Sequence, residues 1–439
     1  MLTAFIRAFR TPDLRKKLLF TIGVLALFRF GAAVPTPGIS EKAVNYCTGL
    51  ESSSGAAGVY QLVNLFSGGA LLKLSVFALG IMPYITASII LQLLAVVIPR
   101  LETLRQEGQA GQAKITQYTR YLTVGLAILQ STGIVALARS GNLFSGCTRS
   151  LIPDPSVFTI STMVICMTAG TAVIMWLGEL ITDRGVGNGM SVLIFTTVIS
   201  QMAGYLLDIY KAKHAFTLAI VLVVGIAIVA FVVFMEQAQR RIPVQYAKRM
   251  VGRKMYGGTS TYIPLKVNQA GVIPVIFASS LLYIPNLAAS LFGSKTHPAG
   301  WVTFVDTYLG SGSNGDQPLY MGLFFVLIVF FTYFYVSITF NPTEVADNMK
   351  KYGGFIPGIR PGRPTAQYLN YVLTRLTAPG SVYLGLIALL PMVAFGVLGV
   401  GSQFPFGGTS ILIAVGVGLD TVKQIESQLQ QRNYEGFLR

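Results

Sequence analysis

The feature that most constrains this chain is a series of long apolar runs, each near the length that a helix needs to cross a bilayer. Only 11% of the residues are charged, against about 25% in a soluble chain. Barrel strands would be shorter and would alternate in polarity, so only helices satisfy the backbone here. The sequence therefore predicts an all-α membrane protein with about ten transmembrane helices. We place them near residues 18–36, 74–98, 121–138, 157–179, 187–207, 215–235, 267–292, 319–340, 376–398 and 404–422.

The net charge of +16 is distributed unevenly between the predicted loops. If the N-terminus is cytoplasmic, most of the 33 lysines and arginines lie on cytoplasmic segments. By the positive-inside rule, this bias predicts that both termini are cytoplasmic. Two cytoplasmic segments, 236–266 and 341–367, hold more basic residues than orientation requires.

Two of the three cysteines fall on predicted outer loops, namely Cys47 and Cys147, while Cys166 lies within the fourth predicted span. An oxidising compartment outside the membrane could join the first two. The sequence alone cannot place their Cα atoms within bridging distance, so it leaves a disulfide open.

The second and seventh predicted spans share a segment. Residues 80–88 and 271–279 have Gly, Pro, Ile, Ala and Ser at matching positions. A shorter match joins the fifth and tenth spans, at residues 191–194 and 410–413. Because each half would contain five helices, an odd number, the second half would enter the membrane from the opposite side. Chance similarity between apolar helices is the alternative.

The repeat divides the chain into an N-terminal half, 1–213, and a C-terminal half, 214–439. Halves related by an axis in the membrane plane meet along a central line. Matched positions that would converge there are Ile85, Ile276, Ile194 and Ile413. Pro83 and Pro274 are expected to weaken their helices one or two turns from the start.

The predicted spans contain almost no ionisable side chains, which an ion-coupled transporter needs near the bilayer midplane. Both histidines, His214 and His297, fall in loops, and Glu179 lies at a helix end. Arg29 is the one interior charge, and it could snorkel or pair with a carbonyl. The chain has no phosphate-binding G-x-x-x-x-G-K-[ST] loop, metal-ligand spacing or nucleophile–His–acid set. We therefore expect that the protein is not an enzyme and binds no cofactor. The energy for directional transport must then come from a partner.

Five ordered motifs carry a family resemblance. They are GIMPYITASIILQLL at 80–94, WLGELITDRGVGNGM at 176–190, PLKVNQAGVIP at 264–274, NPTEVADN at 341–348 and GIRPG at 358–362. In these motifs the chain resembles the SecY family, the channel subunits of the bacterial protein translocase. The resemblance extends from about residue 18 to 420, while the outer loops 45–58 and 293–318 show none. It implies a ten-helix channel that passes unfolded polypeptides across the plasma membrane and releases apolar segments into lipid.

The resemblance also implies an apolar ring that closes the channel between two funnels. By motif position the ring residues are Ile81, Ile85, Met190, Ile194, Ile276 and Ile413. Met190 stands where relatives commonly have isoleucine, and its adaptable side chain should preserve the seal. A narrow apolar collar disfavours continuous water. Ordinary helix packing is the alternative for any one of these positions.

Residues 60–73 precede the second span but are too short and too interrupted to cross the membrane. The resemblance implies that they form the plug, a short helix that fills the outer funnel of the resting channel. Its central residues are Leu62, Val63, Asn64, Leu65, Phe66, Ser67, Gly68 and Gly69, and the glycine pair allows a hinge. A membrane-edge helix with no gating role is the alternative.

The second and seventh helices are expected to face each other as a lateral gate toward lipid. Candidate polar contacts across it are Thr86, Gln92, Asn268 and Ser280. Any one of them could instead make a local hydrogen bond within its own helix.

The two basic cytoplasmic segments are implied to bind the SecA motor ATPase, or the ribosome through its RNA phosphates. The candidate residues are Arg240, Arg241, Lys248, Arg249 and Arg360. Fixing the topology is the alternative explanation for part of this charge. Arg360 differs because Gly358, Pro361 and Gly362 should hold it on a stiff, exposed tip. SecE and usually SecG are the further partners that the resemblance implies.

Two other classes of protein would share some of these sequence features. A ten-helix secondary transporter would share the inverted repeat, but it would need intramembrane Asp, Glu or His. A ribosome anchor without a pore would share the basic loops. Electrical recording after removal of the plug would separate that anchor from a channel.

Overall fold

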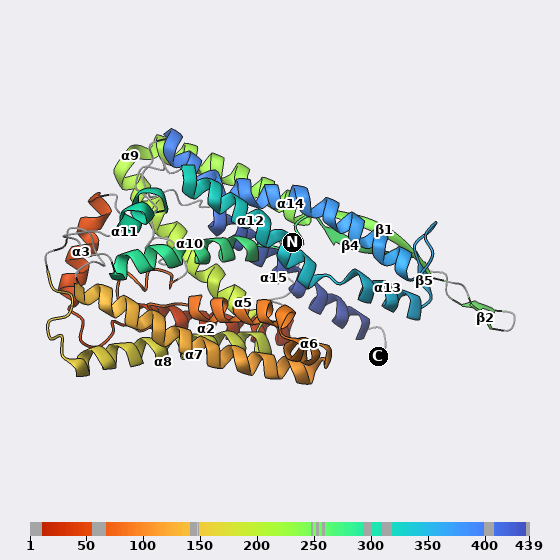
Figure 1. Cartoon of the computed structure of the whole chain (residues 1–439), viewed down its shortest axis with the longest axis horizontal. Coiled ribbons are helices and arrows are strands. Elements are labelled where there is room, and N and C mark those ends of the chain that lie inside the picture. Colours follow the sequence, from red (N-terminus) through yellow and green to blue (C-terminus); the bar gives the residue numbers. More distant parts are fainter. Residues whose placement is uncertain are drawn as a thin grey trace.

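The computed structural model describes residues 11–54, 67–140, 147, 149–246, 249–251, 254–256, 260–292, 300–309, 318–398 and 408–435. Long helices follow the long axis of the molecule, and small β-sheets lie at one end (Figure 1). The first part of the chain forms α2 (Pro12–Ala33), α3 (Glu41–Ser54), α5 (Met82–Val97), α6 (Pro99–Gln106), α7 (Gln109–Ser140), α8 (Val157–Arg184) and α9 (Gly189–Gln237). The second part forms α10 (Ile273–Phe292), α11 (Gly300–Phe304), the π-helix η1 (Val305–Leu309), α12 (Pro318–Thr339), α13 (Pro342–Lys351), α14 (Arg363–Leu398) and α15 (Gly408–Glu435).

Five of the described helical stretches are long and apolar enough to cross a bilayer. The count is six if α5 and α6 form one broken span, since the chain bends by 103° between them. The long helices coincide with predicted runs, although α7, α14 and α15 each extend several turns beyond the predicted run at one end. Helix α3 lies where the sequence analysis expected a loop.

The fifth and sixth predicted spans form one continuous helix, which the sequence analysis did not foresee. Helix α9 contains 49 residues, and the stretch predicted as an outer loop between the two spans is helical. Figure 1 shows that α9 doubles back near its middle instead of running straight. This one helical element therefore contains both the fifth and the sixth predicted spans, and it links the two halves.

Both repeat segments adopt the same local structure, and this structure corrects the prediction for their prolines. Gly80 and Gly271 occupy matching positions and have φ angles of 56° and 61°, a left-handed conformation that glycine permits. Helices α5 and α10 begin two residues later, so Pro83 and Pro274 lie at the second helical position. Proline is tolerated there because the first amides of a helix have no intrahelical partner. These prolines therefore begin the helices and do not weaken their interiors.

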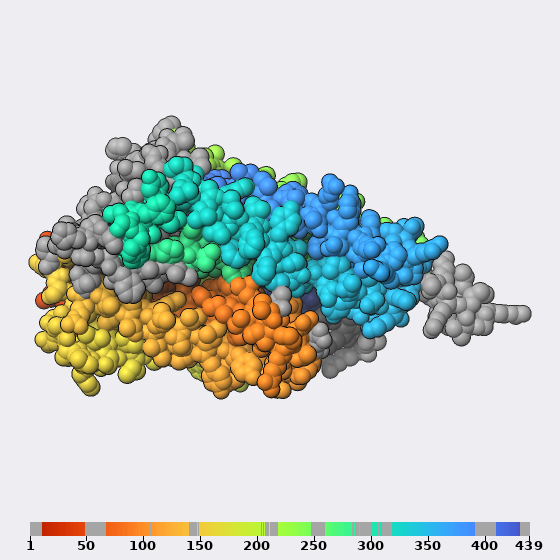
Figure 2. Space-filling model, viewed as in Figure 1, coloured from red at the N-terminus to blue at the C-terminus, as the bar shows by residue number. Residues whose placement is uncertain are grey.

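The two halves lie side by side along the molecule (Figure 2). In one half, α2 packs on α8, and α7 packs on both α5 and α8. In the other half, α12 packs on α10 and α14, and α14 packs on α15. Contacts between the halves join α9 to α15 and α7 to α10. The boundary between the halves is thus closed by helices from both.

The two basic segments predicted separately form one folded unit at the end of the bundle. Strand β1 (Gln239–Tyr246) pairs antiparallel with β4 (Ser260–Lys266) and with β5 (Gly354–Phe355), and β2 (Arg249–Val251) pairs with β3 (Lys254–Tyr256). Alternate residues of β1, Ile242 and Val244, are buried, as expected for a strand with one face on a core. That core also contains Met349 of α13 and Leu369 of α14.

A disulfide joins Cys47 of α3 to Cys147, with 5.5 Å between their Cα atoms. The sequence left this bond open, and the tertiary structure brings together two residues 100 positions apart. Cys47 is fully buried in an apolar cluster that also includes Leu71, Leu74 and Met163. The bond fixes α3 to the loop that precedes α8.

Thiol labelling tests this disulfide. Because the chain has three cysteines, the denatured but unreduced protein should take up one maleimide tag, on Cys166, and three after reduction. Closing so long a loop should stabilise the protein by about 2–4 kcal/mol, so Cys47→Ser should lower the melting temperature. The Cys166→Ser protein is the control and should take up tags only after reduction. Three tags without reduction would show that the bond is absent.

Candidate pore constriction and docking surface

All six predicted ring residues lie in one apolar cluster between the two halves. Ile81, Ile194, Ile276 and Ile413 are each at most 8% exposed, and the partly buried Ile85 and Met190 pack against them. We call this group of six and the apolar residues packed with it the ring cluster. It receives residues from α5, α8, α9, α10 and α15, and also Phe28 of α2 and Ala70. Phe28 and Ala70 were not among the predicted ring residues, because neither lies in a repeat segment or in one of the five motifs.

Backbone hydrogen bonds fix Ile85 and Ile276 at the starts of α5 and α10. The carbonyl of Ile81 accepts hydrogen bonds from the amides of Tyr84 and Ile85, and that of Val272 accepts from Val275 and Ile276. Such caps satisfy amides that the first turn of a helix leaves unpaired. Ile85 and Ile276 are therefore placed by the first turns of α5 and α10, whereas Ile194 and Ile413 lie one turn further inside α9 and α15.

The motif that precedes α9 positions Met190 in the same way. The Asn188 side chain accepts from the amides of Met190 and Ser191, at 3.2 and 3.4 Å, which caps α9. A Cβ atom at Gly178 would lie 2.5 Å from the Met190 sulfur, so α8 approaches closely there. The hydroxyl of Thr182 donates to the Gly178 carbonyl at 3.0 Å and accepts from the Gly189 amide at 2.9 Å.

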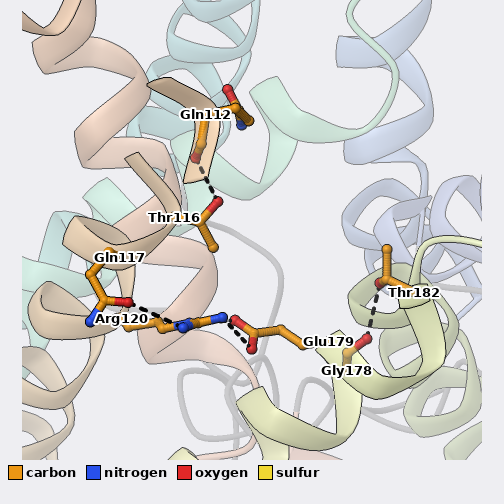
Figure 3. Close-up of polar contacts among 7 residues, drawn as sticks. All are labelled: Gln112, Thr116, Gln117, Arg120, Gly178, Glu179 and Thr182. Carbon is orange, nitrogen blue, oxygen red and sulfur yellow. Dashed lines mark hydrogen bonds and ion pairs between the residues drawn. The ribbon is translucent and has the colours of Figure 1, made fainter. Parts of the chain in front are cut away.

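An ion pair joins α7 to α8 beside this turn (Figure 3). The Nε and Nη2 atoms of Arg120 each donate to a carboxylate oxygen of Glu179 at 2.8 Å, and Nη1 donates to Gln117 at 3.1 Å. Two parallel bonds of this kind fix both position and orientation. The sequence placed Glu179 at a helix end but gave no sign of Arg120, which is 59 residues away.

The described part of the predicted plug lies against the ring cluster. Leu62, Val63, Asn64, Leu65 and Phe66 fall outside the described residues. Ser67 is buried, and its hydroxyl accepts from the Leu71 amide at 3.1 Å. Gly68 and Gly69 have φ angles of 66° and 89°, in agreement with a tight turn at the predicted hinge.

Residues 67–81 form turns, and backbone hydrogen bonds hold their C-terminal part to the end of α2. The amide of Thr36 donates to the Leu74 carbonyl at 3.1 Å, and the amide of Val76 donates to the Val34 carbonyl at 2.9 Å. The predicted second span thus begins at Met82, later than expected.

Arg29 pairs with a carbonyl, one of the two roles expected for it. Its Nη1 donates to the Gly68 carbonyl at 3.1 Å, and its Nη2 donates to the hydroxyl of Ser200 on α9. These two hydrogen bonds join α2, the predicted plug and α9.

The four candidate gate residues differ in their hydrogen-bond partners and in their exposure. The Thr86 hydroxyl donates to the Met82 carbonyl within α5, at 2.9 Å. The Asn268 amide donates to Glu236 at 2.5 Å and to the Gly271 carbonyl at 3.3 Å, all within the C-terminal half. Gln92 is exposed and Ser280 is half-buried. A polar contact across the gate therefore stays a prediction.

The candidate docking residues lie on the folded unit formed by the sheet and α13. Arg240 and Arg241 are exposed on β1, and the Arg241 guanidinium lies 4.8 Å from the centre of the Tyr262 ring. Lys248 falls outside the described residues, and Arg249 begins β2. Arg360 is exposed on the turn that precedes α14.

The turn that carries Arg360 is held on both sides. The backbone carbonyl of Arg360 accepts a hydrogen bond from the Thr365 hydroxyl at 2.9 Å. Gly358 and Gly362 have φ angles of 81° and 104°, and Ile356 before them is buried in the core of the sheet unit. These contacts fit the stiff, exposed tip that the sequence predicted.

Comparison with known proteins identifies the family. The SecY family model matches residues 75–422. The chain is 66% identical to the protein translocase subunit SecY of Streptomyces galbus, over the full length of both. A structure described as a protein-conducting channel superposes with a TM-score of 0.62 at 19% identity, over 94% of this chain and 91% of that one. Sec61 in the canine ribosome–channel complex superposes with a TM-score of 0.59 at 18% identity, over the same shares. The likeness to these two structures concerns the fold, and it confirms the all-α membrane architecture.

Proposed function

Because the chain belongs to the SecY family of protein translocase subunits, we propose that its ring cluster seals the path through which a polypeptide crosses the membrane. The protein is a channel subunit and not an enzyme. One observation supports the proposal for the ring. The five isoleucines and Met190 lie in one apolar cluster, to which both halves contribute residues.

An apolar ring suits a channel that accepts many sequences. It offers a passing chain no hydrogen bonds, so no particular peptide is retained, whereas a ring of charges would bind some and reject others. It also disfavours continuous water, which limits ion leakage. Met190 adds an unbranched side chain that can adapt its shape to the passing chain.

The two halves, 1–213 and 214–439, would separate along their boundary to widen this path. Helices α5 and α10 carry matching segments and begin with the same backbone conformation, which supports their role as paired gate helices. A nascent apolar segment would leave through this seam, because each leucine gains roughly 0.3–0.6 kcal/mol at the centre of the bilayer.

Energy for transport would come from a partner that binds the sheet unit. Exposed Arg240, Arg241 and Arg360 are suited to bind carboxylates of the SecA motor or the phosphates of ribosomal RNA. The canine channel of similar fold is described in complex with a ribosome, which supports the second partner. We further propose assembly with SecE and SecG in the bacterial plasma membrane, with both termini cytoplasmic by the charge bias.

Photocrosslinking tests the ring directly. A crosslinking amino acid placed at position 85 or 276 should capture a secretory chain stalled during export. Position 165 on α8 is the control, since Ile165 is 66% exposed on the outside of the bundle. Equal capture at all three positions, or capture at position 165 alone, would refute a path through the ring cluster.

A further inference from the structure

Arg29 places a positive charge inside the apolar first span. Burying such a charge costs free energy, so its presence indicates a functional role. Helix α2 places Arg29 between Phe28, which is fully buried in the ring cluster, and Phe30, which is 72% exposed. A charged side chain at membrane depth normally pairs with protein groups or reaches water. Arg29 is half-buried, and its guanidinium is directed to two acceptors inside the protein.

The two acceptors belong to different elements. Nη1 binds the carbonyl of Gly68 in the plug segment, and Nη2 binds the hydroxyl of Ser200 on α9. Ser200 lies six residues beyond the ring residue Ile194, so α9 carries both on nearby turns. The planar guanidinium can hold two acceptors at once, which an ammonium does with less geometric control.

Gly68 is shaped for this contact. A Cβ atom there would lie 2.8 Å from Nη1 of Arg29 and 3.1 Å from the Thr197 side chain. Its φ of 66° is also one that residues with a side chain rarely adopt. The glycine therefore brings the plug backbone close enough for its carbonyl to accept from the arginine.

We infer that Arg29 is a latch that holds the plug segment in the resting channel, an inference that rests on the proposed function. Departure of residues 67–71 breaks the bond from Arg29 to Gly68. It leaves a charged donor with one acceptor fewer in apolar surroundings, which disfavours opening. Ala70, two residues after Gly68, packs in the ring cluster. Departure of residues 67–71 therefore also removes the packing of Ala70 against that cluster.

Resting conductance of the reconstituted channel tests the latch. Loss of a charge-assisted hydrogen bond shifts a two-state equilibrium by about ten- to a hundredfold. Arg29→Leu should therefore raise the resting conductance by about that factor, and Ser200→Ala, which keeps the Gly68 bond, should raise it less. Arg139→Leu is the control, because Arg139 is an exposed arginine at the end of α7, and it should leave the conductance unchanged.

A second variant guards against loss of folding. Gly68→Ala keeps every charge but forces the plug backbone away from Arg29, and it should also raise the resting conductance. The Cys47–Cys147 disulfide, read by thiol labelling, reports whether each variant has folded. Folded Arg29→Leu and Gly68→Ala proteins with the parent conductance would overturn the latch. If Arg29→Leu does not fold, the conductance of Gly68→Ala and Ser200→Ala decides in the same way.

The same variants separate this inference from the proposed function. Crosslinking of a stalled chain at position 85 should persist in each folded variant. Persistent crosslinking with unchanged conductance would refute the latch and leave the proposed path through the ring intact. Failure of crosslinking in the parent protein would instead remove the proposed path through the ring.

Discussion

Replacing Arg360 with glutamate is expected to stop SecA-driven export while the protein still inserts and folds. Arg360 projects from an exposed turn whose backbone is held by the Thr365 hydroxyl and shaped by Gly358 and Gly362. Placing like charges together in an interface costs several kcal/mol, which corresponds to about a hundredfold or more in binding. The measurement is the rate at which a secretory protein enters vesicles that contain the variant, with SecA and ATP supplied.

Lys114→Glu provides a matched control for that experiment. Lys114 is exposed on α7, in the other half of the chain and outside the sheet unit, and the reversal changes the net charge equally. We expect export by this variant to remain near the parent rate. Normal export by Arg360→Glu, or equal loss in both variants, would contradict a specific contact at the tip.

Deleting residues 61–70 is expected to convert a closed resting channel into one that conducts ions readily. The deletion removes the Gly68 carbonyl that Arg29 binds and the Ala70 side chain that packs in the ring cluster. The ring would then be the remaining barrier to ions, and an apolar constriction admits water as it widens. We expect at least a tenfold rise in resting conductance, by the argument used for the loss of a charge-assisted contact. The measurement is the current across a planar bilayer without substrate.

Deletion of residues 311–317 is the control for chain shortening. These residues belong to the predicted outer loop 293–318, which carries none of the predicted ring, plug or docking residues, and their loss should leave the resting current unchanged. Unchanged current after deletion of 61–70 would argue that the segment is a membrane-edge helix without a gating role.

Much of the ring cluster could be predicted because its residues belong to repeated, motif-bearing helices. Ile85 and Ile276 occupy equivalent positions in two segments with the same local fold, so the sequence itself marks them as a pair. The prolines were misinterpreted because periodicity does not show where a helix begins. The left-handed glycines at 80 and 271 delay both helices, and the prolines then occupy the first turn.

The missed features are contacts between residues far apart in the chain. Arg120 and Glu179 belong to different helices, and neither position carries a local signal for the other. The sheet unit joins β1 to β5 across more than a hundred residues, so two basic loops that look separate become one surface. Cys47 and Cys147 were recognised as candidates, but only the packing of α3 brings their Cα atoms within 5.5 Å.

The sequence by itself determined that this chain folds in a bilayer, the approximate positions of its spans and the match between the segments that begin α5 and α10. These follow from local apolar length and from repeated residues, because a bilayer requires each span to satisfy its own backbone. The tertiary structure decided which charges are paired and which segments share a core. It placed Arg29 against Gly68 and Ser200, since a charge in an apolar interior takes whichever acceptors the folded chain brings to it.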